Sequence, residues 1–451
     1  MLIESLSGVR GYDTDLTEEL IQAYAAALKE LLGCRKVVIG RDSRASGVRI
    51  QEQLTSALRR FGVVVIDLGI CPTPTVEMAV VRHEVDAGIV ITASHNPLPW
   101  NGLKFLAADG LFLSPNEMAQ IKNLRQNILG KYKKQKFSIG VLVKYEHANR
   151  DHIADVLGLS YIDVEAIRSH KFKVAVDAVN GAGSIVIPDL LRELGCEVFA
   201  IHCDPGQPFP HPPEPLPENL TDLMQAVKDH RADLGLAIDP DGDRLAIVSD
   251  EGLPISEEYT LVLATKLVLS QAKTKSRFVV ANLSTTRALE DIAREYDAAV
   301  IRTPIGEINV AQRMQAVNAL IGGEGNGGVI LPEAHLGRDS LVGTVLVLQL
   351  LSNEKRPLAE VMRTLPRYYM AKRKAPRGQA DFNEIIRRLI PSFEDAEINT
   401  EDGLKFSWAD RWVHIRTSNT EPIVRIYAEA PTSQAADQLA DRFVSAVQKF
   451  I

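Results

Sequence analysis

The stretch Leu234-Gly235-Leu236-Ala237-Ile238-Asp239-Pro240-Asp241-Gly242-Asp243-Arg244 joins a short apolar run to an acidic turn. Apolar runs of this length are typical of strands buried on both faces of a parallel sheet. In open α/β sheets, ligands bind just outside the carboxyl ends of such strands. The stretch therefore predicts an α/β fold with a functional loop directly after Ile238.

The acidic turn itself indicates a metal site. Asp239, Asp241 and Asp243 repel one another unless a cation neutralises them. Mg²⁺ suits such a loop because it takes oxygen ligands, few of them protein carboxylates, and leaves room for a phosphate oxygen. An EF-hand would need Gly and Glu where the chain has Arg244 and Asp250. A solvated acidic turn is the other alternative, and the buried strand before the turn favours the metal.

Short apolar runs alternate with helical periodicities along most of the chain, and this pattern starts again twice. It predicts three α/β units with mainly parallel sheets covered by helices. The C-terminal part differs, because two strands joined by a polar loop precede an amphipathic helix, which predicts a smaller α+β domain. The predicted strands are Val37–Ile39, Val63–Ile66, Ala87–Thr92, Lys173–Ala178, Gly195–Ile201, Leu234–Ile238, Phe278–Leu283, Ala298–Arg302, Ala319–Gly322, Trp412–Ile415 and Ile423–Tyr427.

Length also indicates several domains, since 451 residues exceed what one hydrophobic core usually supports. We expect joints between domains at residues 131–136, around Asp250–Glu257, and at the basic stretch Lys372–Arg377. The predicted domains are residues 1–150, 151–255, 256–370 and 371–451.

Charge and cysteine content exclude several classes of protein. The net charge is −7 and no long block of Lys and Arg occurs, so we expect no nucleic-acid partner. The four cysteines form no C-x-x-C pair, which argues against a zinc knuckle or a redox motif. Because no targeting segment and no apolar run of roughly 18 residues is present, we expect a soluble, cytoplasmic protein without a membrane partner.

A second loop of interest, Thr92–Pro97, places the Ser94 hydroxyl beside His95 at a strand end. Taken alone, this loop favours a structural turn, because Ser, Asn and Pro are turn formers. A Ser–His catalytic unit is disfavoured, since adjacent residues rarely act as base and nucleophile. No G-x-S-x-G elbow surrounds Ser94, which weighs against a hydrolase. Lys104, ten residues on, supplies a cation for a phosphate.

Two more polar loops complete the set. In Gly322–Gly328, glycines allow close approach of a ligand, and Glu324 and Asn326 supply acceptors and a donor for sugar hydroxyls. This loop matches neither a Walker A motif nor a dinucleotide fingerprint. The loop Arg416–Pro422 combines a guanidinium, hydroxyls and amides, which suits a phosphate. Alone, the glycine-rich loop is equally consistent with a bare turn, and Arg416–Pro422 slightly favours an ordinary polar hairpin loop. All four loops together indicate phosphoryl transfer on a sugar phosphate.

These four loops resemble those of the α-D-phosphohexomutases, in order and over essentially the whole chain. T-A-S-H-N-P resembles the family's phosphoserine loop, D-P-D-G-D-R its metal loop, G-E-G-N-G-G its sugar loop and R-T-S-N-T-E-P its phosphate loop. The nearer likeness is to the archaeal-type phosphoglucosamine mutases. The resemblance implies four domains around a central cleft, a phosphorylated Ser94, and Mg²⁺ held by that phosphate with Asp239, Asp241 and Asp243.

The resemblance also implies roles for further residues. Lys104, Arg244 and Arg10 would support the reacting phosphate, with Lys104 as the first candidate for proton transfer, and His95 would orient the serine loop. Glu324 and Asn326 would bind the sugar 3- and 4-hydroxyls. The non-reacting phosphate and the cleft wall are assigned to Arg416, Ser418, Asn419, Thr420, Arg425 and Gly306.

One position departs from the family pattern. Many bacterial relatives read G-E-x-S-G-H in the sugar loop, and that histidine is associated with proton transfer, whereas this chain has Gly328 there. His335 lies seven residues later. The group that acts as general acid and base is therefore left open.

The implied activity interconverts hexose 6-phosphate and hexose 1-phosphate through a hexose 1,6-bisphosphate, which also serves as activator. Glucosamine phosphate is the expected sugar, and glucose and mannose phosphates are the alternatives. A Mg²⁺-dependent sugar-phosphate phosphatase and a non-catalytic sugar-phosphate sensor are more remote alternatives. Both a monomer and a dimer fit the sequence.

Overall fold

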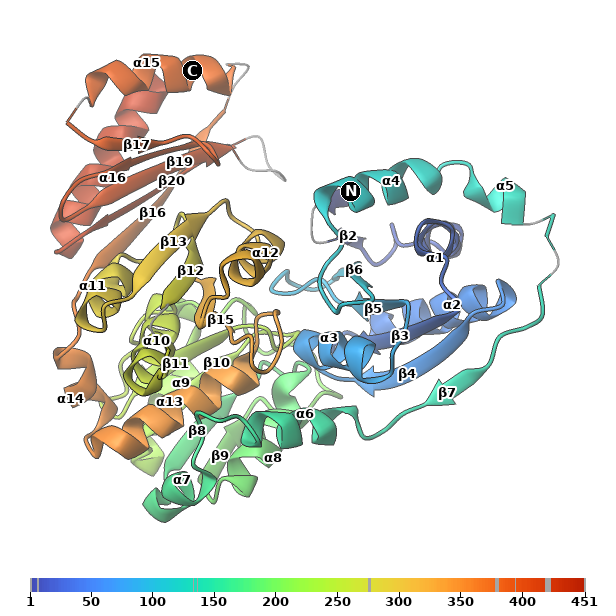
Figure 1. Cartoon of the computed structure of the whole chain (residues 1–451), viewed down its shortest axis with the longest axis horizontal. Helices are drawn as coiled ribbons and strands as arrows, with labels where there is room; N and C mark the ends of the chain where they lie inside the picture. Colours follow the sequence, from blue (N-terminus) through green and yellow to red (C-terminus); the bar gives the residue numbers. More distant parts are fainter. Residues whose placement is uncertain are drawn as a thin grey trace.

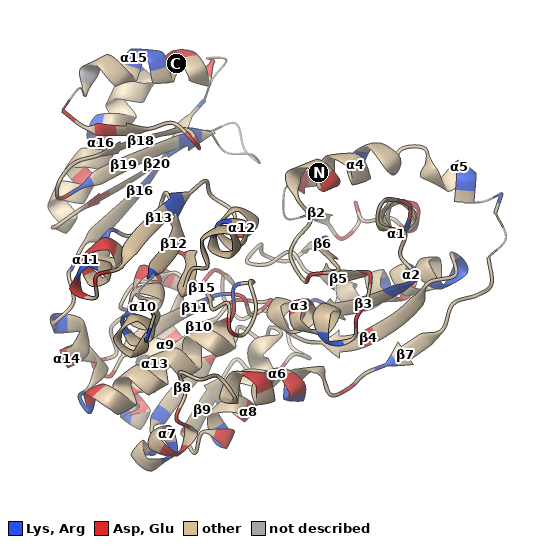
Figure 2. Ribbon diagram, in the orientation of Figure 1, with Lys and Arg blue, Asp and Glu red and all other residues tan. Residues whose placement is uncertain are grey.

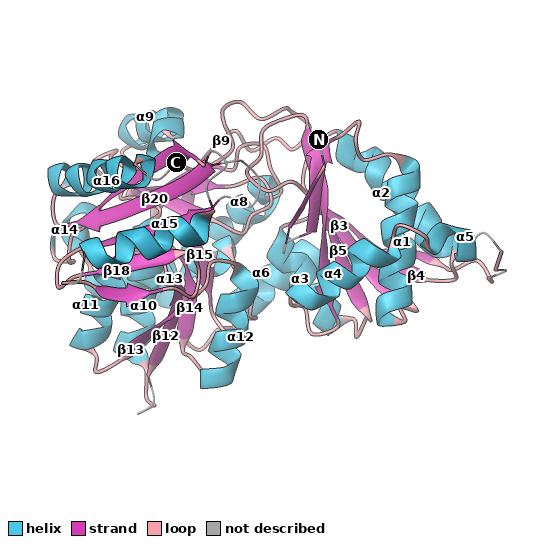
Figure 3. Cartoon of the chain, turned by 90° about the horizontal axis from the view of Figure 1, so that it is seen from above, coloured by secondary structure: helices cyan, strands magenta, loops and turns pink. Residues whose placement is uncertain are grey.

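The protein forms four domains arranged around a central junction (Figure 1). The computed structural model describes residues 2–5, 8–132, 134–135, 137–274, 277–377, 381–393, 395–417 and 423–449. Within these ranges, no helix is both long and apolar enough to cross a membrane. Seen from above, the first domain lies on one side and the other three lie on the other (Figure 3).

The first domain is built on a seven-stranded mixed sheet. Its strands lie in the order β1-β2-β6-β5-β3-β4-β7. The part formed by β5, β3, β4 and β7 is parallel, whereas β5, β6, β2 and β1 run antiparallel to one another. The strands are β1 (Ile3–Ser5), β2 (Gly8–Tyr12), β3 (Lys36–Arg41), β4 (Val64–Ile70), β5 (Ala87–Ile91), β6 (Trp100–Ala107) and β7 (Leu142–Lys144).

Helices cover both faces of this sheet, as an open parallel arrangement requires. The first of them begins at an N-cap, where the Thr17 side chain accepts a hydrogen bond from Leu20 N–H, and ends at Gly33 with φ of 65°. The helices are α1 (Glu18–Leu32), α2 (Ser46–Arg60), α3 (Thr73–Arg82), α4 (Pro115–Leu124) and α5 (Ile128–Tyr132).

The second and third domains repeat a smaller version of the same scheme. Their four-stranded sheets have the orders β11-β10-β8-β9 and β13-β12-β14-β15. The strands of the second are β8 (Lys173–Asp177), β9 (Glu197–Ile201), β10 (Leu234–Ile238) and β11 (Leu245–Ser249). Those of the third are β12 (Phe278–Asn282), β13 (Ala299–Thr303), β14 (Ile321–Glu324) and β15 (Gly328–Ile330).

The helices of these two domains follow the strands. In the second they are α6 (Ala148–Leu157), α7 (Val164–His170), α8 (Gly183–Glu193), the 3₁₀ turn η1 (Pro217–Asn219) and α9 (Thr221–His230). In the third they are α10 (Glu258–Gln271), α11 (Ala288–Glu295), α12 (Glu307–Val317), α13 (Ser340–Glu354) and α14 (Leu358–Arg363). Acidic and basic residues are mixed along outer helices such as α7 and α11 (Figure 2).

A shared topology positions the functional loops. In each of the first three domains, one strand pairs in parallel with one neighbour and antiparallel with the strand that follows it. The serine loop connects β5 to β6, the acidic loop connects β10 to β11, and the glycine-rich loop connects β14 to β15. Each loop therefore lies where the chain leaves the parallel part of its sheet.

The fourth domain is smaller and its sheet is wholly antiparallel, in the order β16-β20-β19-β18-β17. The predicted pair of strands and the terminal helix are present, within a larger sheet than expected. Its elements are β16 (Tyr369–Pro376), α15 (Phe382–Leu389), η2 (Ile390–Ser392), β17 (Glu397–Asn399), β18 (Leu404–Ser407), β19 (Trp412–Thr417), β20 (Ile423–Ala430) and α16 (Ser433–Gln448).

The prediction of a joint at Lys372–Arg377 is wrong. Residues from Lys372 to Pro376 belong to β16 and pair with β20 along their whole length. The basic composition arises because alternate side chains of this edge strand face solvent or the cleft, while Ala371 and Ala375 are buried.

The four sheets do not each have a separate hydrophobic core. The first and fourth domains each have a core of their own, whereas the second and third share one continuous apolar cluster. Helices α10 and α13 lie inside this shared cluster and are buried almost all round. The middle of the molecule is therefore one packed body, flanked by the first and fourth domains.

Candidate active site

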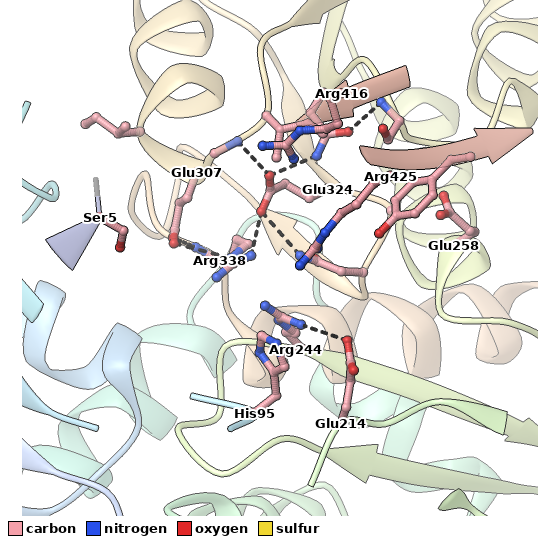
Figure 4. Close-up of a pocket in the computed structure, with 18 of the residues that line it drawn as sticks. Ser5, His95, Glu214, Arg244, Glu258, Glu307, Glu324, Arg338, Arg416 and Arg425 are labelled. Carbon is pink, nitrogen blue, oxygen red and sulfur yellow. Dashed lines mark hydrogen bonds and ion pairs between the residues drawn. The ribbon is translucent and has the colours of Figure 1, made fainter. Parts of the chain in front are cut away.

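A cleft of about 350 Å³ lies where loops from all four domains meet. Figure 4 shows charged side chains pointing into it from several elements. Of the residues predicted from sequence, nine line the cleft: Arg10, His95, Lys104, Arg244, Gly306, Glu324, Asn326, Arg416 and Arg425. Ser418, Asn419 and Thr420 lie outside the described residues.

Ser94 lies at the border between the first and second domains. Its Oγ is 3.4 Å from Asp239 Oδ2 and 3.4 Å from His95 Nδ1. The residue has φ of 50°, a conformation that non-glycine residues adopt rarely and mostly where the surroundings impose it. Ser94 N–H donates to Thr92 Oγ1 at 2.8 Å, and the Thr92 hydroxyl donates to Asp42.

Arg44 holds the serine loop from behind and was missed in the sequence. Its buried guanidinium donates to the carbonyl oxygens of Ser94, Asn96 and Trp100 at 2.6 to 2.7 Å. Asp42 neutralises it at 2.9 Å. The loop Gly40–Arg44 after a buried strand carried the signal, but nothing in the pattern showed which loop the guanidinium would reach.

The acidic loop forms a compact cluster of three fully buried carboxylates. One oxygen of each of Asp239, Asp241 and Asp243 lies within 4.8 Å of the others. Asp239 Oδ1 accepts the backbone N–H groups of Asp243 and Arg244 at 3.1 and 3.2 Å. Asp241 Oδ1 and Asp243 Oδ1 are buried without a hydrogen-bond partner among the described residues.

The electrostatics of this cluster fit a bound cation. Burial and the neighbouring carboxylates Asp243 and Asp241 hold the pKa of Asp239 well above its usual range. Buried carboxylate oxygens without a hydrogen-bond partner are costly unless a cation binds them. Hard oxygen donors in this number suit Mg²⁺.

Lys104 links the serine-bearing domain to the acidic loop. Its Nζ is 2.7 Å from Asp241 Oδ2 and 3.4 Å from Asp243 Oδ2. Burial alone would lower the pKa of Lys104, but the two carboxylates raise it above its ordinary value. Thr73 from the same domain donates to Asp241 Oδ2 at 2.7 Å. Lys104 is therefore a fixed positive charge.

Arg10, Arg244 and His95 surround the same centre. Arg10 donates to the Asn96 side chain at 3.1 Å, and Arg244 Nε is 3.6 Å from Asp243. Burial, Arg244 and Arg10 hold the pKa of His95 well below its usual value, so its imidazole is neutral. Cations thus face the space in front of Ser94.

Arg338 is a second residue that sequence reasoning missed. This buried guanidinium contacts Asp243 of the acidic loop at 2.6 Å and Glu324 of the glycine-rich loop at 2.5 Å. Its Nε is 3.3 Å from Glu307. Arg338 therefore fixes the metal loop and the sugar loop relative to each other. It follows β15 at a distance from both motifs, so no local pattern revealed it.

Glu324 is held as an oriented, ionised acceptor. Asn282 Nδ2 donates to its Oε1 at 2.8 Å, and the Gly306 N–H donates to the same oxygen at 3.1 Å. Burial would raise the pKa of Glu324, but Arg338 and these donors keep it below its usual range. Asn326 lies beside it, with its side-chain amide 3.3 Å from Oε2.

Two arginines line the side of the cleft that the fourth domain contributes. Arg416 on β19 and Arg425 on β20 are direct neighbours in the antiparallel pair. Both line the cleft, together with Lys372 and Tyr427. Guanidinium groups this close favour an anion such as phosphate between them.

His335 lies away from the cleft. Its ring contacts Asp339 at 3.0 Å and Glu77 at 3.3 Å, and His152 contacts the same Asp339 oxygen at 2.7 Å. These residues come from the first three domains and form a buried polar contact between them. His335 therefore does not replace the missing histidine of the sugar loop.

Comparison with known proteins matches the whole chain to one family. Domains described as phosphoglucomutase/phosphomannomutase alpha/beta/alpha domains I, II and III match residues 4–130, 150–252 and 256–369, and the C-terminal domain matches residues 370–446. A "Probable phosphoglucosamine mutase" of Methanopyrus kandleri is 34% identical over 451 residues, covering 99% of this chain and 97% of the relative.

Two further proteins show the same similarity. A "Phosphoglucomutase/phosphomannomutase" of Thermococcus kodakarensis is 36% identical over 447 residues, which cover 95% of this chain and 94% of the relative. A crystal structure of a phosphoglucomutase/phosphomannomutase family protein from Burkholderia thailandensis superimposes with a TM-score of 0.83 at 28% identity, covering 98% of this chain and 96% of that chain.

Proposed function

The chain belongs to the phosphoglucomutase/phosphomannomutase family, and from that premise we propose that it converts glucosamine 6-phosphate into glucosamine 1-phosphate through a phosphoserine at Ser94. As a member of this family it is a phosphohexomutase, that is, an intramolecular phosphotransferase. The sugar and the roles of individual residues are the proposed part.

The observation that carries the proposal is the position of Ser94. Its hydroxyl lies 3.4 Å from the buried carboxylate Asp239, and the next residue, His95, lines the same cleft as the sugar loop and the paired arginines. A phosphoryl group on Ser94 would add negative charge beside Asp239 and the clustered carboxylates Asp241 and Asp243, and a cation would have to offset that charge.

The family is magnesium-dependent, and Asp239, Asp241, Asp243 and the Ser94 phosphate are the residues that would hold Mg²⁺. Bound there, the ion would neutralise charge on the transferring group. Lys104, Arg10 and Arg244 add fixed positive charge around the same group, and His95 and Arg44 orient the serine loop.

In the proposed reaction, phospho-Ser94 gives its phosphoryl group to the free hydroxyl of a bound hexose phosphate, which forms a hexose 1,6-bisphosphate. The bisphosphate turns over in the cleft, and its other phosphate returns to Ser94. A trace of hexose 1,6-bisphosphate therefore acts as activator by phosphorylating Ser94. Such transfer depends mainly on positioning and electrostatic stabilisation.

In the proposed arrangement, positively charged residues lie at both ends of the cleft, and the residues that bind the sugar hydroxyls lie between them. Arg416 and Arg425 would hold the non-reacting phosphate, with Ser418, Asn419 and Thr420 contributing from the same loop. Glu324 and Asn326 would bind the sugar 3- and 4-hydroxyls against the wall at Gly306. Each phosphate of the bisphosphate must occupy each end of the cleft in turn. The contacts to the 3- and 4-hydroxyls must therefore be possible in both orientations of the sugar.

The choice of sugar rests on relatives that span the whole chain. The Methanopyrus kandleri protein carries a phosphoglucosamine mutase name, and the Thermococcus kodakarensis protein carries a phosphoglucomutase/phosphomannomutase name. Glucose and mannose phosphates are therefore the second candidates.

For the four functional units we propose the boundaries 1–150, 151–255, 256–370 and 371–451.

The test is a substrate panel. The protein is incubated with Mg²⁺, a trace of glucose 1,6-bisphosphate and, in turn, glucosamine 6-, glucose 6- and mannose 6-phosphate, and 1-phosphate formation is followed by phosphorus NMR. We expect the fastest conversion with glucosamine 6-phosphate. Faster turnover of glucose or mannose phosphate would overturn the choice of sugar. Release of inorganic phosphate without any 1-phosphate would indicate a phosphatase, and no reaction at all a sensor.

A further inference from the structure

Gly328 leaves no room for any side chain, because Arg338 fills the space beside it. A Cβ at Gly328 would lie 2.2 Å from Arg338 Cδ and 2.9 Å from Arg338 Cγ. Arg338 therefore occupies the space next to Gly328, the sequence position that corresponds to the sugar-loop histidine of histidine-bearing relatives. A guanidinium stays protonated in proteins, so Arg338 cannot accept a proton from a sugar hydroxyl.

Arg338 instead contacts three buried carboxylates. The guanidinium lies 2.6 Å from Asp243, 2.5 Å from Glu324 and 3.3 Å from Glu307. Lys104 and Arg244 also lie 3.4 and 3.6 Å from Asp243. The charge of Asp243 is therefore better offset than that of Glu307. Asp243 and Glu324 make the short contacts. Glu307 makes the longest one and is the group best placed to gain and lose a proton.

The backbone presents Glu307 to the cleft. It is the first residue of α12, directly after Gly306, whose φ of 125° only glycine adopts readily. Its Oε1 accepts the backbone N–H of Arg338 at 2.6 Å, which fixes the side chain. Glu307 lines the same cleft as Lys104 and Glu324, and Figure 4 shows it beside Arg338.

We propose that Glu307 is the catalytic residue that takes the proton from the attacking sugar hydroxyl and returns it to the departing one, with Arg338 as the residue that positions it. This inference rests on the proposed mutase function.

Two other titratable groups of the cleft, Lys104 and His95, are less suited to this role. Lys104, the first candidate from sequence, is held protonated by Asp241 and Asp243. His95 lies on the serine side, 3.4 Å from Ser94 Oγ.

The surroundings of Glu307 also suit proton exchange near neutral pH. Burial raises the pKa of Glu307 to about 8; Arg338 and Lys104 act against this shift, and Glu77 and Asp243 add to it. A pKa close to the working pH suits a group that must both accept and donate a proton.

The sugar oxygen forms a bond to phosphorus, the bond from phosphorus to Ser94 Oγ breaks, and the hydroxyl proton passes to Glu307. Ser94 Oγ takes a proton from a water molecule, which leaves hydroxide. In the second transfer Ser94 gives that proton back to the hydroxide as its oxygen attacks, and protonated Glu307 donates to the sugar oxygen that leaves.

The test compares Glu307→Gln with Glu295→Gln, an exposed carboxylate on α11 in the same domain. We expect kcat of Glu307→Gln to fall about 100-fold or more, which is the usual worth of a general acid-base group, while KM changes little. The limb of the kcat/KM profile of the wild type that rises with pH should disappear in this variant. Glu295→Gln should keep both the rate and the profile.

Glu307→Asp covers the case in which Glu307→Gln does not fold. It keeps the carboxyl group, so it should retain the rising limb with a lower kcat. The inference is overturned if the wild type forms 1-phosphate and Glu307→Gln does so within about threefold of it, or if Glu307→Asp loses the rising limb. A wild type that forms no 1-phosphate from any hexose phosphate instead overturns the mutase function itself.

Discussion

Two buried carboxylate oxygens, Asp241 Oδ1 and Asp243 Oδ1, carry most of the case for a metal at the level of single residues. Their partners on the other side, Lys104 and Arg338, occupy one oxygen of each carboxylate and leave the second directed elsewhere. Asp241 Oδ1 and Asp243 Oδ1 have no hydrogen-bond partner among the described residues, although Arg244 Nε lies 3.6 Å from Asp243 Oδ1, and buried oxygens in this state favour a cation.

Asp241→Asn should weaken the response to Mg²⁺, because it removes one of three negative charges around the ion. The concentration of Mg²⁺ that gives half-maximal mutase activity should rise about tenfold or more, which corresponds to about 1.4 kcal/mol of binding free energy. Asp229→Asn, at an exposed position on α9, is the matched control. An unchanged Mg²⁺ titration in the Asp241 variant would show that the ion binds elsewhere.

Arg44 and Arg338 show at the same scale why part of the site was not predictable. Residues such as Ser94, Asp241 and Glu324 were found because each lies in a loop directly after an apolar strand. Arg44 and Arg338 reach those loops from other parts of the chain, across 50 and 95 residues to Ser94 and Asp243. Local patterns carry no signal for such contacts, which arise only from the packing of domains.

At the scale of elements, the strands that end in functional loops were predicted and the strands that follow those loops were not. β5 and β10 are short, apolar and buried, so their composition identifies them, whereas β14 (Ile-Gly-Gly-Glu) begins two residues after the start of the predicted strand Ala319–Gly322. The antiparallel return strands β6, β11 and β15 begin in or immediately after polar motifs. Their pairing with the preceding strand defines them, and pairing is not a property of one segment.

The contact between β19 and the third domain makes the stability of the folded protein depend on pH. His414 on β19 is buried, its Nδ1 lies 2.7 Å from the Ser284 hydroxyl, and its Nε2 lies 2.6 Å from the Asp402 carbonyl oxygen. Burial lowers the pKa of His414 to about 4. Because the folded state binds this proton less readily than the unfolded chain, His414 contributes stability above about pH 6.5 that is lost as the pH falls towards 4.

His414→Gln should therefore reduce the loss of stability on acidification. We expect the denaturant midpoint of the wild type to fall between pH 7 and pH 4.5, followed through the fluorescence of Trp408 and Trp412 in the fourth domain. The fall should be smaller in His414→Gln, although its midpoint at pH 7 is lower. His147→Gln, at an exposed histidine, is the control. An equal fall in wild type and His414→Gln would contradict the assignment.

At the scale of the whole molecule, the shared core of the second and third domains is the feature that keeps the metal loop and the sugar loop in register. Arg338 bridges these loops directly, and α10 and α13 bury their apolar side chains between the two sheets. The four-domain organisation was predictable from the repeating pattern. The merging of the second and third cores was not predictable. A helix that is apolar on all faces is expected to be buried, but its sequence does not show which sheets pack against it.

Leu263→Ala in α10 tests this merging. Removing a fully buried leucine should cost about 2–5 kcal/mol. Hydrogen exchange at β10 and β12 should accelerate together, whereas exchange at β3 of the first domain should change little. Acceleration confined to β12 would show that the second and third domains unfold independently.

The central claim is that the phosphoryl group is carried on Ser94, and the most direct measurement is the intact mass of the protein after brief incubation with glucose 1,6-bisphosphate and Mg²⁺. We predict one added phosphoryl group in the wild type, located on the peptide that contains Ser94, lost again on addition of excess glucosamine 6-phosphate, and absent in Ser94→Ala. An equally phosphorylated Ser94→Ala protein, or a wild type that never gains the group, would contradict the account.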